Sequence, residues 1–394
     1  MTPETAREFA ALEAQAQRIM GVFARAGYEA VAPAIIQPAG VFLDAVGEAL
    51  RARTYVFTDR DGAELCLRPD LTVPVCRLHL ERANNPAAPA RYCYNGAAFR
   101  YQPAGAGAAH PREFRQAGIE SFGAPDPIAA EAETLDCIVA GIEATGIDRR
   151  ALQMRFGDLA LMRALLDALD MPAPWRTRLQ ARFGRPNAFK AALTAMTHGA
   201  ARPAGRLPAA LSEVLAGTGD GDVAARVVVH MEMSGVEAFG ARGVAEVAAG
   251  IAAIVADGRA KPLSKATVDV IGAFIAIETP CRGAADVIHA LARRERINLD
   301  RPLQTFNARL DRFAGHGLDL EASSFSGSFG RALGYYTGFV FEIGGPGLRE
   351  NSPVAGGGRY DGLLRVTGSP VDIPAVGAAI HTERLLAAVR ERAA

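Results

Sequence analysis

The sequence predicts an α+β fold that is interrupted by a helical insertion. Strand-like segments with alternating apolar and polar residues dominate the chain up to Phe122, residues from about 150 to 315 show helical periodicity, and short strand-like segments return near the C-terminus. Strands followed by helices and then by strands again are typical of one α+β domain with an insertion. We therefore expect residues 1–150 and 316–394 to form the core domain and residues 151–315 to form a largely helical insertion region.

The composition argues against several classes of protein. Lys and Arg together number 43, as do Asp and Glu, so the formal net charge is zero and attracts no nucleic acid. The 5 cysteines are scattered and never spaced as CxxC, which argues against a disulfide framework and a zinc site. The N-terminus is charged, and no apolar run reaches membrane-spanning length. We expect a cytoplasmic protein with no metal and with neither nucleic acid nor membrane as a partner.

The N-terminal part of the chain predicts a helix and two hairpins. Thr2–Pro3 is typical of a helix start, and apolar residues recur after it at steps of three and four. Asp61–Gly62 lies between two strand-like runs and is a strong signal for a tight hairpin. A longer hairpin joins Tyr92–Tyr101 to Glu113–Phe122 through a glycine-rich loop, Pro103–His110.

Helical patterns dominate the middle of the chain, and strand patterns return at its end. The clearest helical segments are Ile128–Ala144, Leu159–Leu169, Pro208–Leu215, Val244–Val255 and Ala284–Arg294. The later strand-like segments are Glu321–Phe329, Thr337–Ile343 and Ala375–Ile380. Thr382 is suited to begin a last helix.

Three residues of the strand before Phe122 predict a small polar pocket. Period-two alternation places Gln116, Gly118 and Glu120 on one face, and the glycine leaves space between an amide and a carboxylate. A glutamate pairs with an ammonium, and a glutamine orients a carboxylate or a ring nitrogen, so an amino acid fits as the ligand. The alternative is an exposed sheet face with a bulge glycine, and this strand alone favours that alternative.

Three polar residues near the two hairpins have both a structural and a functional interpretation. Asp70 and Thr72 follow a predicted strand, where they either cap the next helix or hold a ligand ammonium. Arg100 lies just before the glycine-rich loop, where it either reaches a phosphate or forms a surface ion pair.

The C-terminal part contains three further motifs. The run Gly356–Gly358 indicates that backbone approaches either a ligand or a neighbouring strand closely. Arg331 precedes Tyr335 and Tyr336, which either pack as aromatic residues or surround a ligand with phenol groups. The segment His381–Arg384 lies at a predicted helix start, where it either binds an anion or forms a capping ion pair.

These motifs occur together in one order. They are Leu67–Thr72 (LRPDLT), Phe99–Arg100, Arg112–Glu120 (REFRQAGIE), Leu333–Gly338 (LGYYTG), Gly356–Asp361 (GGGRYD) and Glu383–Arg384. The set resembles the catalytic domain of class II histidyl-tRNA synthetases and their paralogues, and it covers nearly the whole chain. The resemblance implies an antiparallel sheet flanked by helices, a helical insertion, and a dimer formed through the region near the first hairpin.

The resemblance also implies a histidine pocket. Asp70 and Thr72 match positions that hold the ammonium group of histidine, and Gln116 and Glu120 match positions that grip the amino acid. The tyrosine pair that lines the imidazole pocket corresponds to Tyr335 and Tyr336.

Three arginines match the remaining positions of the synthetase site. Arg100 and Arg384 correspond to the class II arginines that bind ATP phosphates, so they form a vestigial phosphate site in this chain. Arg331 corresponds to the extra arginine that synthetases use in amino-acid activation.

The sequence departs from the synthetase pattern at several positions. Too few residues follow Arg384 for the anticodon-binding domain of a synthetase. Gln102 stands where synthetases carry a glutamate, and His110 stands where they carry an arginine. His381 replaces a small residue just before the last arginine. The resemblance therefore implies a histidine pocket without specific tRNA binding and without a complete ATP clamp.

This combination resembles the regulatory-subunit family of ATP phosphoribosyltransferase, a group of synthetase paralogues that serve the first step of histidine biosynthesis. The resemblance implies a chain that has no catalysis or cofactor of its own, binds histidine, and mediates feedback inhibition. The implied partners are a short-form catalytic phosphoribosyltransferase subunit, in a hetero-octamer, and a second copy of the chain. Histidine binds either in the synthetase-like pocket or at the subunit interface.

Two alternatives remain. The first is a truncated histidyl-tRNA synthetase-like enzyme that forms histidyl-adenylate, which the presence of Arg100, Arg331 and Arg384 favours. The second is a synthetase-like adaptor that binds no ligand.

Overall fold

The computed structural model describes residues 5–45, 52–102, 111–197, 209–235, 238–239, 242–331, 333–345 and 352–393. The chain forms two compact units. The core unit comprises Met1–Leu161, Ala276–Ala292 and Leu299–Ala394, and the helical unit comprises Met162–Ile275 and Arg293–Asn298.

A nine-stranded sheet forms the centre of the core unit, in the order β1-β5-β6-β14-β13-β12-β7-β11-β10. Neighbouring strands are antiparallel except in the pairs β1·β5 and β11·β7, which are parallel. Its strands are β1 (Glu29–Ala30), β5 (Ala90–Phe99), β6 (Glu113–Phe122), β7 (Gln153–Asp158), β10 (Glu278–Pro280), β11 (Ser324–Ser326), β12 (Phe339–Gly344), β13 (Ala355–Arg359) and β14 (Ala375–His381).

The long hairpin expected from the sequence is formed by β5 and β6, which pair without interruption from Ala90 to Phe99. The pairing of β6 with β14 is equally continuous, so Gly118 lies in regular strand and not in a bulge. Almost all of β6 is buried. The alternative of an exposed sheet face with a bulge glycine is therefore wrong, because both faces of this strand are covered. The expected loop Pro103–His110 lies outside the described residues.

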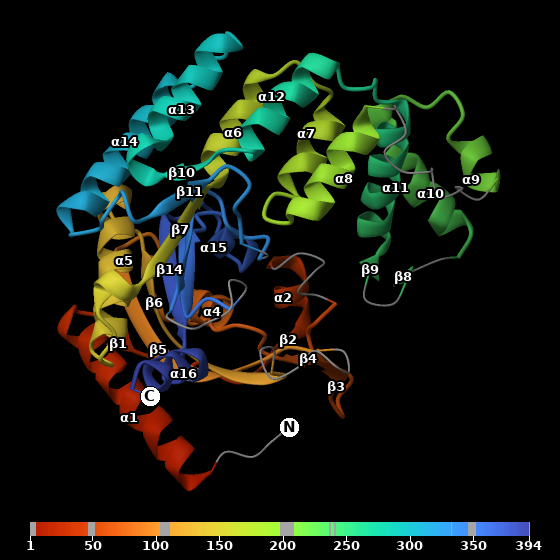
Figure 1. The fold of residues 1–394 in the computed structure, drawn as a ribbon. Helices are drawn as coiled ribbons and strands as arrows, with labels where there is room; N and C mark the ends of the chain where they lie inside the picture. Colours follow the sequence, from red (N-terminus) through yellow and green to blue (C-terminus); the bar gives the residue numbers. More distant parts are fainter. Residues whose placement is uncertain are drawn as a thin grey trace. The chain divides into compact units, whose positions relative to one another are not determined.

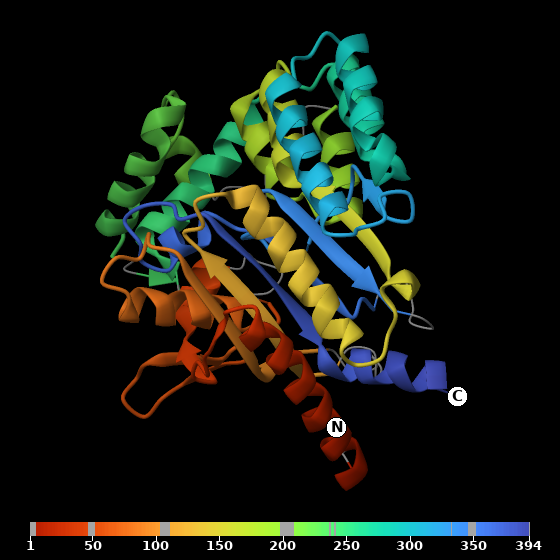
Figure 2. The ribbon, with the colours of Figure 1, turned by 90° about the vertical axis from the view of Figure 1, so that its left-hand side faces the viewer.

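One face of the sheet is covered by helices α1 (Ala6–Arg25), α5 (Pro127–Glu143) and α16 (Thr382–Ala393). Figures 1 and 2 show α1 and α5 lying along this face. Gly141 of α5 lets the helix approach Phe23 of α1 and Ile380 of β14. Helix α1 begins in a capping box, in which the Thr5 side chain accepts from the Glu8 amide and Glu8 accepts from the Thr5 amide. The expected start at Thr2–Pro3 lies outside the described residues.

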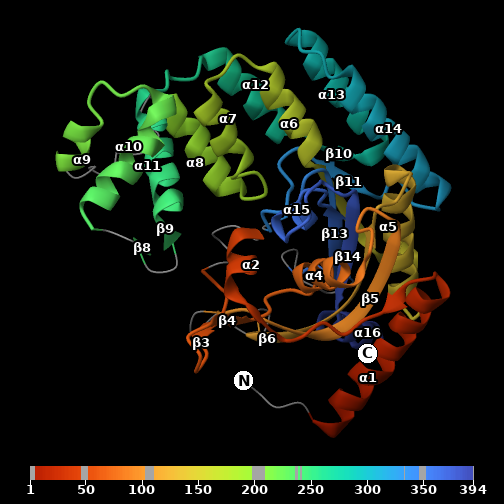
Figure 3. The same ribbon diagram turned by 180° about the vertical axis from the view of Figure 1, so that it is seen from behind.

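The other face carries α2 (Ala39–Ala45), α4 (Thr72–Arg82) and α15 (Leu363–Val366), which contact one another (Figure 3). A small antiparallel sheet lies next to α2, in the order β2-β4-β3, with strands β2 (Ile36–Pro38), β3 (Val56–Thr58) and β4 (Glu64–Leu67). Strands β3 and β4 form the tight hairpin expected at Asp61–Gly62, and Gly62 has a φ of 84°. A core cluster on this face includes Tyr94, Tyr335 and Tyr360.

The structure places the boundaries of the insertion differently from the expected 151–315. Strands β7 and β10 fall inside that range but belong to the central sheet. Helix α14 (Asp300–Gly315) packs on α5, and α13 (Cys281–Arg294) lies mostly in the core unit. Residues 151–161, 276–292 and 299–315 therefore group with the sheet, because strand pairing and helix packing join them to it.

The helical unit has a small core of its own. The Trp175 side chain is fully buried, and its indole N–H donates to the Lys261 carbonyl at 2.7 Å. A separate apolar cluster includes Leu211, Val227 and Met231. The elements of this unit are the remainder of α6 (Leu159–Ala168), α7 (Ala173–Gln180), α8 (Pro186–Met196), α9 (Ala209–Val214), α10 (Val223–Met233), β8 (Ala238–Phe239), β9 (Arg242–Gly243), α11 (Val244–Arg259) and α12 (Lys265–Ile275).

Candidate functional site

The candidate site is centred on the carboxyl group of Glu120, which is completely buried on β6. The Tyr94 hydroxyl donates to its Oε1 atom at 3.0 Å, and the Tyr360 hydroxyl donates to Oε2. The nearby Thr72 hydroxyl also lowers the pKa of this carboxyl group. Burial raises the pKa of Glu120 to about 8, although these hydrogen bonds oppose the shift. The carboxyl group therefore holds its proton near neutral pH and is poised to ionise when a cation approaches.

Asp70 provides a second buried carboxyl group at the start of α4. Its Oδ1 atom accepts from the Val73 amide at 3.3 Å, and Oδ2 lies 3.5 Å from the Tyr335 hydroxyl. Burial raises the pKa of Asp70, and the nearby Arg100 guanidinium partly opposes that rise. One carboxylate oxygen therefore bonds to an amide in the first turn of α4, and the other faces the candidate site.

The two tyrosines predicted for the site form an aromatic wall with Tyr360. The ring centroids of Tyr335 and Tyr336 are 4.8 Å apart, and Tyr335 is 5.7 Å from Tyr360. All three side chains are buried. The wall thus places aromatic surface beside two carboxyl groups, which suits a small ligand that carries both a cationic and a planar group.

Glycines create the space into which these side chains fit. A Cβ at Gly377 would lie 1.6 Å from Oε2 of Glu120, and one at Gly356 would lie 1.7 Å from Nη1 of Arg331. A Cβ at Gly118 would lie 2.5 Å from the Tyr94 hydroxyl, so this phenol fills the space that the sequence predicts for a ligand. The glycines of β13 therefore allow both a side chain and the neighbouring strands to lie close to the backbone of β13.

The three predicted arginines lie near one another, and Arg100 lies next to Asp70. Arg100 donates from Nε to the Pro69 carbonyl at 2.8 Å, and Arg384 donates from Nη1 to the Pro353 carbonyl at 3.0 Å. Arg331 donates to the Phe341 carbonyl at 3.2 Å, and its guanidinium lies 5.8 Å from the Tyr336 ring centroid. Burial lowers the pKa of Arg100 and of Arg384, and Arg331 lowers both further. Such a group of cations favours an anionic ligand.

The structure brings most of the predicted residues together, and it adds two that the sequence interpretation missed. Gln116 is buried on β6 opposite His381, four residues from Glu120 and on the same side of the strand. Tyr94 and Tyr360 hold Glu120 but received no role from the sequence. The alternation of residues along β5 could have predicted that Tyr94 faces Glu120. Tyr360 lies in the motif GGGRYD, in which only the glycines were interpreted. His110 lies outside the described residues.

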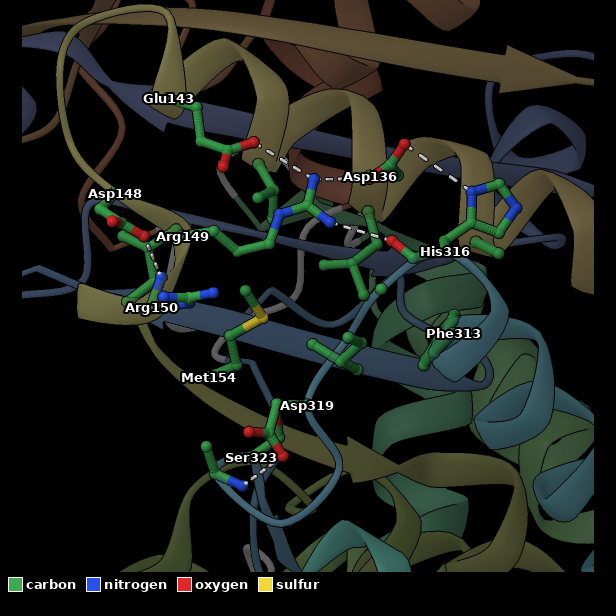
Figure 4. A pocket seen from close by; sticks show the side chains of 17 residues that line it. Asp136, Glu143, Asp148, Arg149, Arg150, Met154, Phe313, His316, Asp319 and Ser323 are labelled. Atoms are coloured by element: carbon green, nitrogen blue, oxygen red, sulfur yellow. Dashed lines mark hydrogen bonds and ion pairs between the residues drawn. The ribbon is translucent and has the colours of Figure 1, made fainter.

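A separate pocket of about 730 Å³ lies in the core unit between α5, the start of β7 and the end of α14 (Figure 4). None of the candidate site residues lines it. Arg149 points into this pocket, but it already pairs with Asp136 at 2.8 Å and Glu143 at 3.2 Å and donates to the His316 carbonyl. These contacts tie α5 to the end of α14, so we assign the charged groups a structural role.

Comparisons with known proteins identify the family. A family model described as histidyl-tRNA synthetase matches residues 2–233 and 248–385. A protein of Chelativorans sp. (strain BNC1) named ATP phosphoribosyltransferase regulatory subunit is 36% identical over 370 residues, which cover 94% of this chain and 96% of the relative. A protein of Brucella anthropi with the same name is 35% identical over 91% of this chain and 92% of the relative.

The chain belongs to the family of ATP phosphoribosyltransferase regulatory subunits. This membership confirms the resemblance that the ordered motifs indicated. The name of this family implies a regulatory role in histidine biosynthesis.

Solved structures confirm the fold expected for this regulatory-subunit family. An ATP phosphoribosyltransferase regulatory subunit/histidyl-tRNA synthetase from Bacillus halodurans has a TM-score of 0.65 at 17% identity, covering 99% of this chain and 82% of that chain. A histidine–tRNA ligase subunit from Alicyclobacillus acidocaldarius has a TM-score of 0.62 at 20% identity, covering 100% of this chain and 96% of that chain. The family member described here therefore has the class II synthetase-like fold.

In the described ranges, no three His, Cys, Asp or Glu side chains are grouped so that they could hold a metal ion. No helix in the described part of the chain is long and apolar enough to cross a bilayer.

Proposed function

We propose that this chain is a non-catalytic regulatory subunit that binds histidine and mediates feedback inhibition of a short-form ATP phosphoribosyltransferase catalytic subunit in the cytoplasm. The buried carboxyl group of Glu120, which accepts hydrogen bonds from Tyr94 and Tyr360, is the observation that carries the proposal. Membership of the regulatory-subunit family supports the choice of partner.

The chemistry of the site suits histidine. The ammonium group pairs with Glu120 or Asp70, and each such contact is a charge-assisted hydrogen bond in a site shielded from water. Tyr335 and Tyr336 offer aromatic surface to the imidazole ring, and the arginines attract the carboxylate. We assign Thr72 and Gln116 to the polar contacts that orient the ligand.

Inhibition requires more than binding. Histidine must bind one state of the complex more tightly than the other, because a ligand with equal affinity for both states shifts no equilibrium. We therefore propose that occupancy of the candidate site changes how this chain engages the catalytic subunit within a hetero-octamer.

We also propose a homodimer through the region of the first hairpin. Apolar side chains of the small sheet β2-β4-β3 are exposed, with Ile36 at 52%, Val56 at 41% and Phe57 at 39%. A group of large exposed apolar residues is typical of a protein interface. A second copy of the chain is the occupant that the family resemblance favours.

The direct test mixes the purified chain with a short-form catalytic subunit and measures phosphoribosyl-ATP formation with and without histidine. We expect activity that depends on this chain and is inhibited by histidine. Activity of the catalytic subunit that is unchanged by this chain would refute the regulatory role. Native mass spectrometry of the same mixture tests the octamer, which a different subunit count would exclude.

A second candidate function is formation of histidyl-adenylate, and the proximity of Arg100, Arg331 and Arg384 to one another, with Arg100 next to Asp70, favours it. Histidine-dependent exchange between ATP and labelled pyrophosphate tests this reaction directly. Our proposal predicts no exchange above background, and robust exchange by the purified chain would replace it with the enzymatic function.

A further inference from the structure

His381 is an unusual neighbour for the three arginines of the site. It ends β14, where it is paired with Gln116 of β6, and its amide donates to the Val354 carbonyl at 2.7 Å. Its imidazole ring lies 5.2 Å from the ring of Phe114, with an angle of 37° between the two planes. The guanidinium carbon of Arg100 is 5.0 Å from the centroid of the same Phe114 ring. The imidazole therefore occupies aromatic surface that adjoins a cation.

The charges around this imidazole are predominantly positive. Arg384, Arg100 and Arg331 all lie close enough to oppose its protonation, and burial acts in the same direction, so the pKa of His381 is well below its ordinary value. Two acidic groups face these arginines, since Asp70 is close to Arg100 and Glu383 is close to Arg384. His381 is therefore a neutral planar ring at physiological pH.

One arginine of the group has an unused donor. The Nε atom of Arg331 is buried and has no hydrogen-bond partner among the described residues. A buried donor without a partner is costly, and a ligand oxygen would relieve that cost. The cluster therefore retains a donor that a ligand oxygen could use.

The contacts of His381 are those of a space-filling side chain. Within the described ranges, its ring contacts Phe114, and no group forms a hydrogen bond with either ring nitrogen. Removing the imidazole would leave no hydrogen-bond partner unsatisfied. It would expose the face of Phe114 next to the arginines.

An aromatic surface beside several arginines is the arrangement in which a nucleotide binds, because its base stacks on the ring and its phosphates pair with guanidinium groups. We propose that His381 is a specificity-determining residue whose imidazole takes the position of a purine base on Phe114, and that it thereby excludes nucleotides from the site. The histidine-binding half, around Glu120, stays accessible. This inference goes beyond the proposed function, and it stands even if histidine is not the ligand of Glu120.

Calorimetric titration of the full chain with ATP tests the proposal. His381→Ala should bind ATP at least about tenfold more tightly than the wild type, because one base–aromatic stack becomes available. Tripolyphosphate, which has no base, should gain less than about threefold. His289→Ala is the matched control, because His289 is exposed on α13, and it should behave as the wild type.

Two more variants secure the interpretation. His381→Phe keeps a ring on Phe114 and should not gain ATP affinity, whereas His381→Ala combined with Phe114→Leu should lose the gain. Thermal melting of every variant checks that it is folded. The proposal fails if wild type and His381→Ala bind ATP equally, or if tripolyphosphate gains as much as ATP. Histidine titration of the same samples tests the proposed function separately.

Discussion

Nε of Arg309 donates to Oε2 of Glu131 at 2.6 Å, and both side chains are buried. The Nη1 atom of the same arginine donates to Asp158, whose other oxygen accepts from the Ala160 amide at the start of α6. Arg359 of β13 also reaches Glu131, at 3.2 Å. This network joins α14, α5, β7 and β13, and Arg359 immediately precedes Tyr360, which holds Glu120.

Removal of this arginine should destabilise the protein strongly. Arg309→Met leaves Asp158 buried without a cation and leaves Glu131 with Arg359 alone. Breaking a buried pair in this way costs about 3–5 kcal/mol. Urea unfolding of the variant and the wild type measures the change. Arg312→Met is the control on the same helix, because Arg312 forms an exposed pair with Asp126 that is worth less than about 1 kcal/mol. Equal effects of the two substitutions would contradict the importance of the network.

The glycine opposite Glu120 should tolerate no side chain. Gly377→Ala would place a Cβ 1.6 Å from Oε2 of Glu120, so the carboxyl group must move and histidine binding should be lost. Gly250→Ala on α11 is the matched control, since no atom lies within 4 Å of its Cβ position. That control should bind histidine normally and be stabilised by up to about 1 kcal/mol. Calorimetry and thermal melting distinguish these outcomes, and normal histidine binding by Gly377→Ala would place the ligand elsewhere.

Replacement of the central carboxyl group should weaken histidine sensing strongly without preventing assembly. Glu120→Gln preserves the shape of the side chain but cannot ionise, and loss of one charge-assisted hydrogen bond weakens binding by about 10- to 100-fold. Glu113→Gln, at the exposed end of the same strand, should be neutral. Inhibition of the mixed complex by histidine is the readout, and unchanged inhibition in Glu120→Gln would move the sensor to the subunit interface.

Proton uptake and release should accompany both folding and binding. Burial raises the pKa of Glu120 from 4.5 to about 8, so between these values the folded chain holds a proton that the unfolded chain has lost. This group therefore favours folding below pH 4.5 and loses that contribution as the pH rises to about 8. Histidine binding, which favours the ionised carboxylate, should release a proton near pH 7. Calorimetry in buffers of different ionisation enthalpy measures it, and Glu120→Gln should show none of this release.

The exposed small sheet should form the dimer contact. Phe57→Glu places a charge on this apolar surface and should convert the dimer to a monomer in sedimentation experiments. Val287→Glu on α13 is a control of similar exposure, at 43% against 39% for Phe57, and should leave the mass unchanged. A wild-type chain that sediments as a monomer at micromolar concentration would refute the proposed homodimer.

Local patterns predicted those elements whose residues follow a regular period. Alternation identified β5 and β6, and Asp61–Gly62 identified the tight hairpin, because their backbone conformation depends on neighbouring residues. Strand β7 was missed in a region expected to be helical. The glycines of β13 were expected to let backbone approach either a ligand or a neighbouring strand. The structure shows approach to the neighbouring strand β14, because a Cβ at Gly357 would lie 2.3 Å from the Cβ of Ala378.

The sequence by itself determined the family, the α+β class and most of the candidate residues, because ordered motifs and periodicity are properties of the linear chain. Only the tertiary structure decided that Glu120 is enclosed by Tyr94 and Tyr360, which lie 26 and 240 positions away from it. It also decided that His381 lies against Phe114 among the arginines. Burial and proximity change the ionisation of these groups, and both arise only when distant segments pack together.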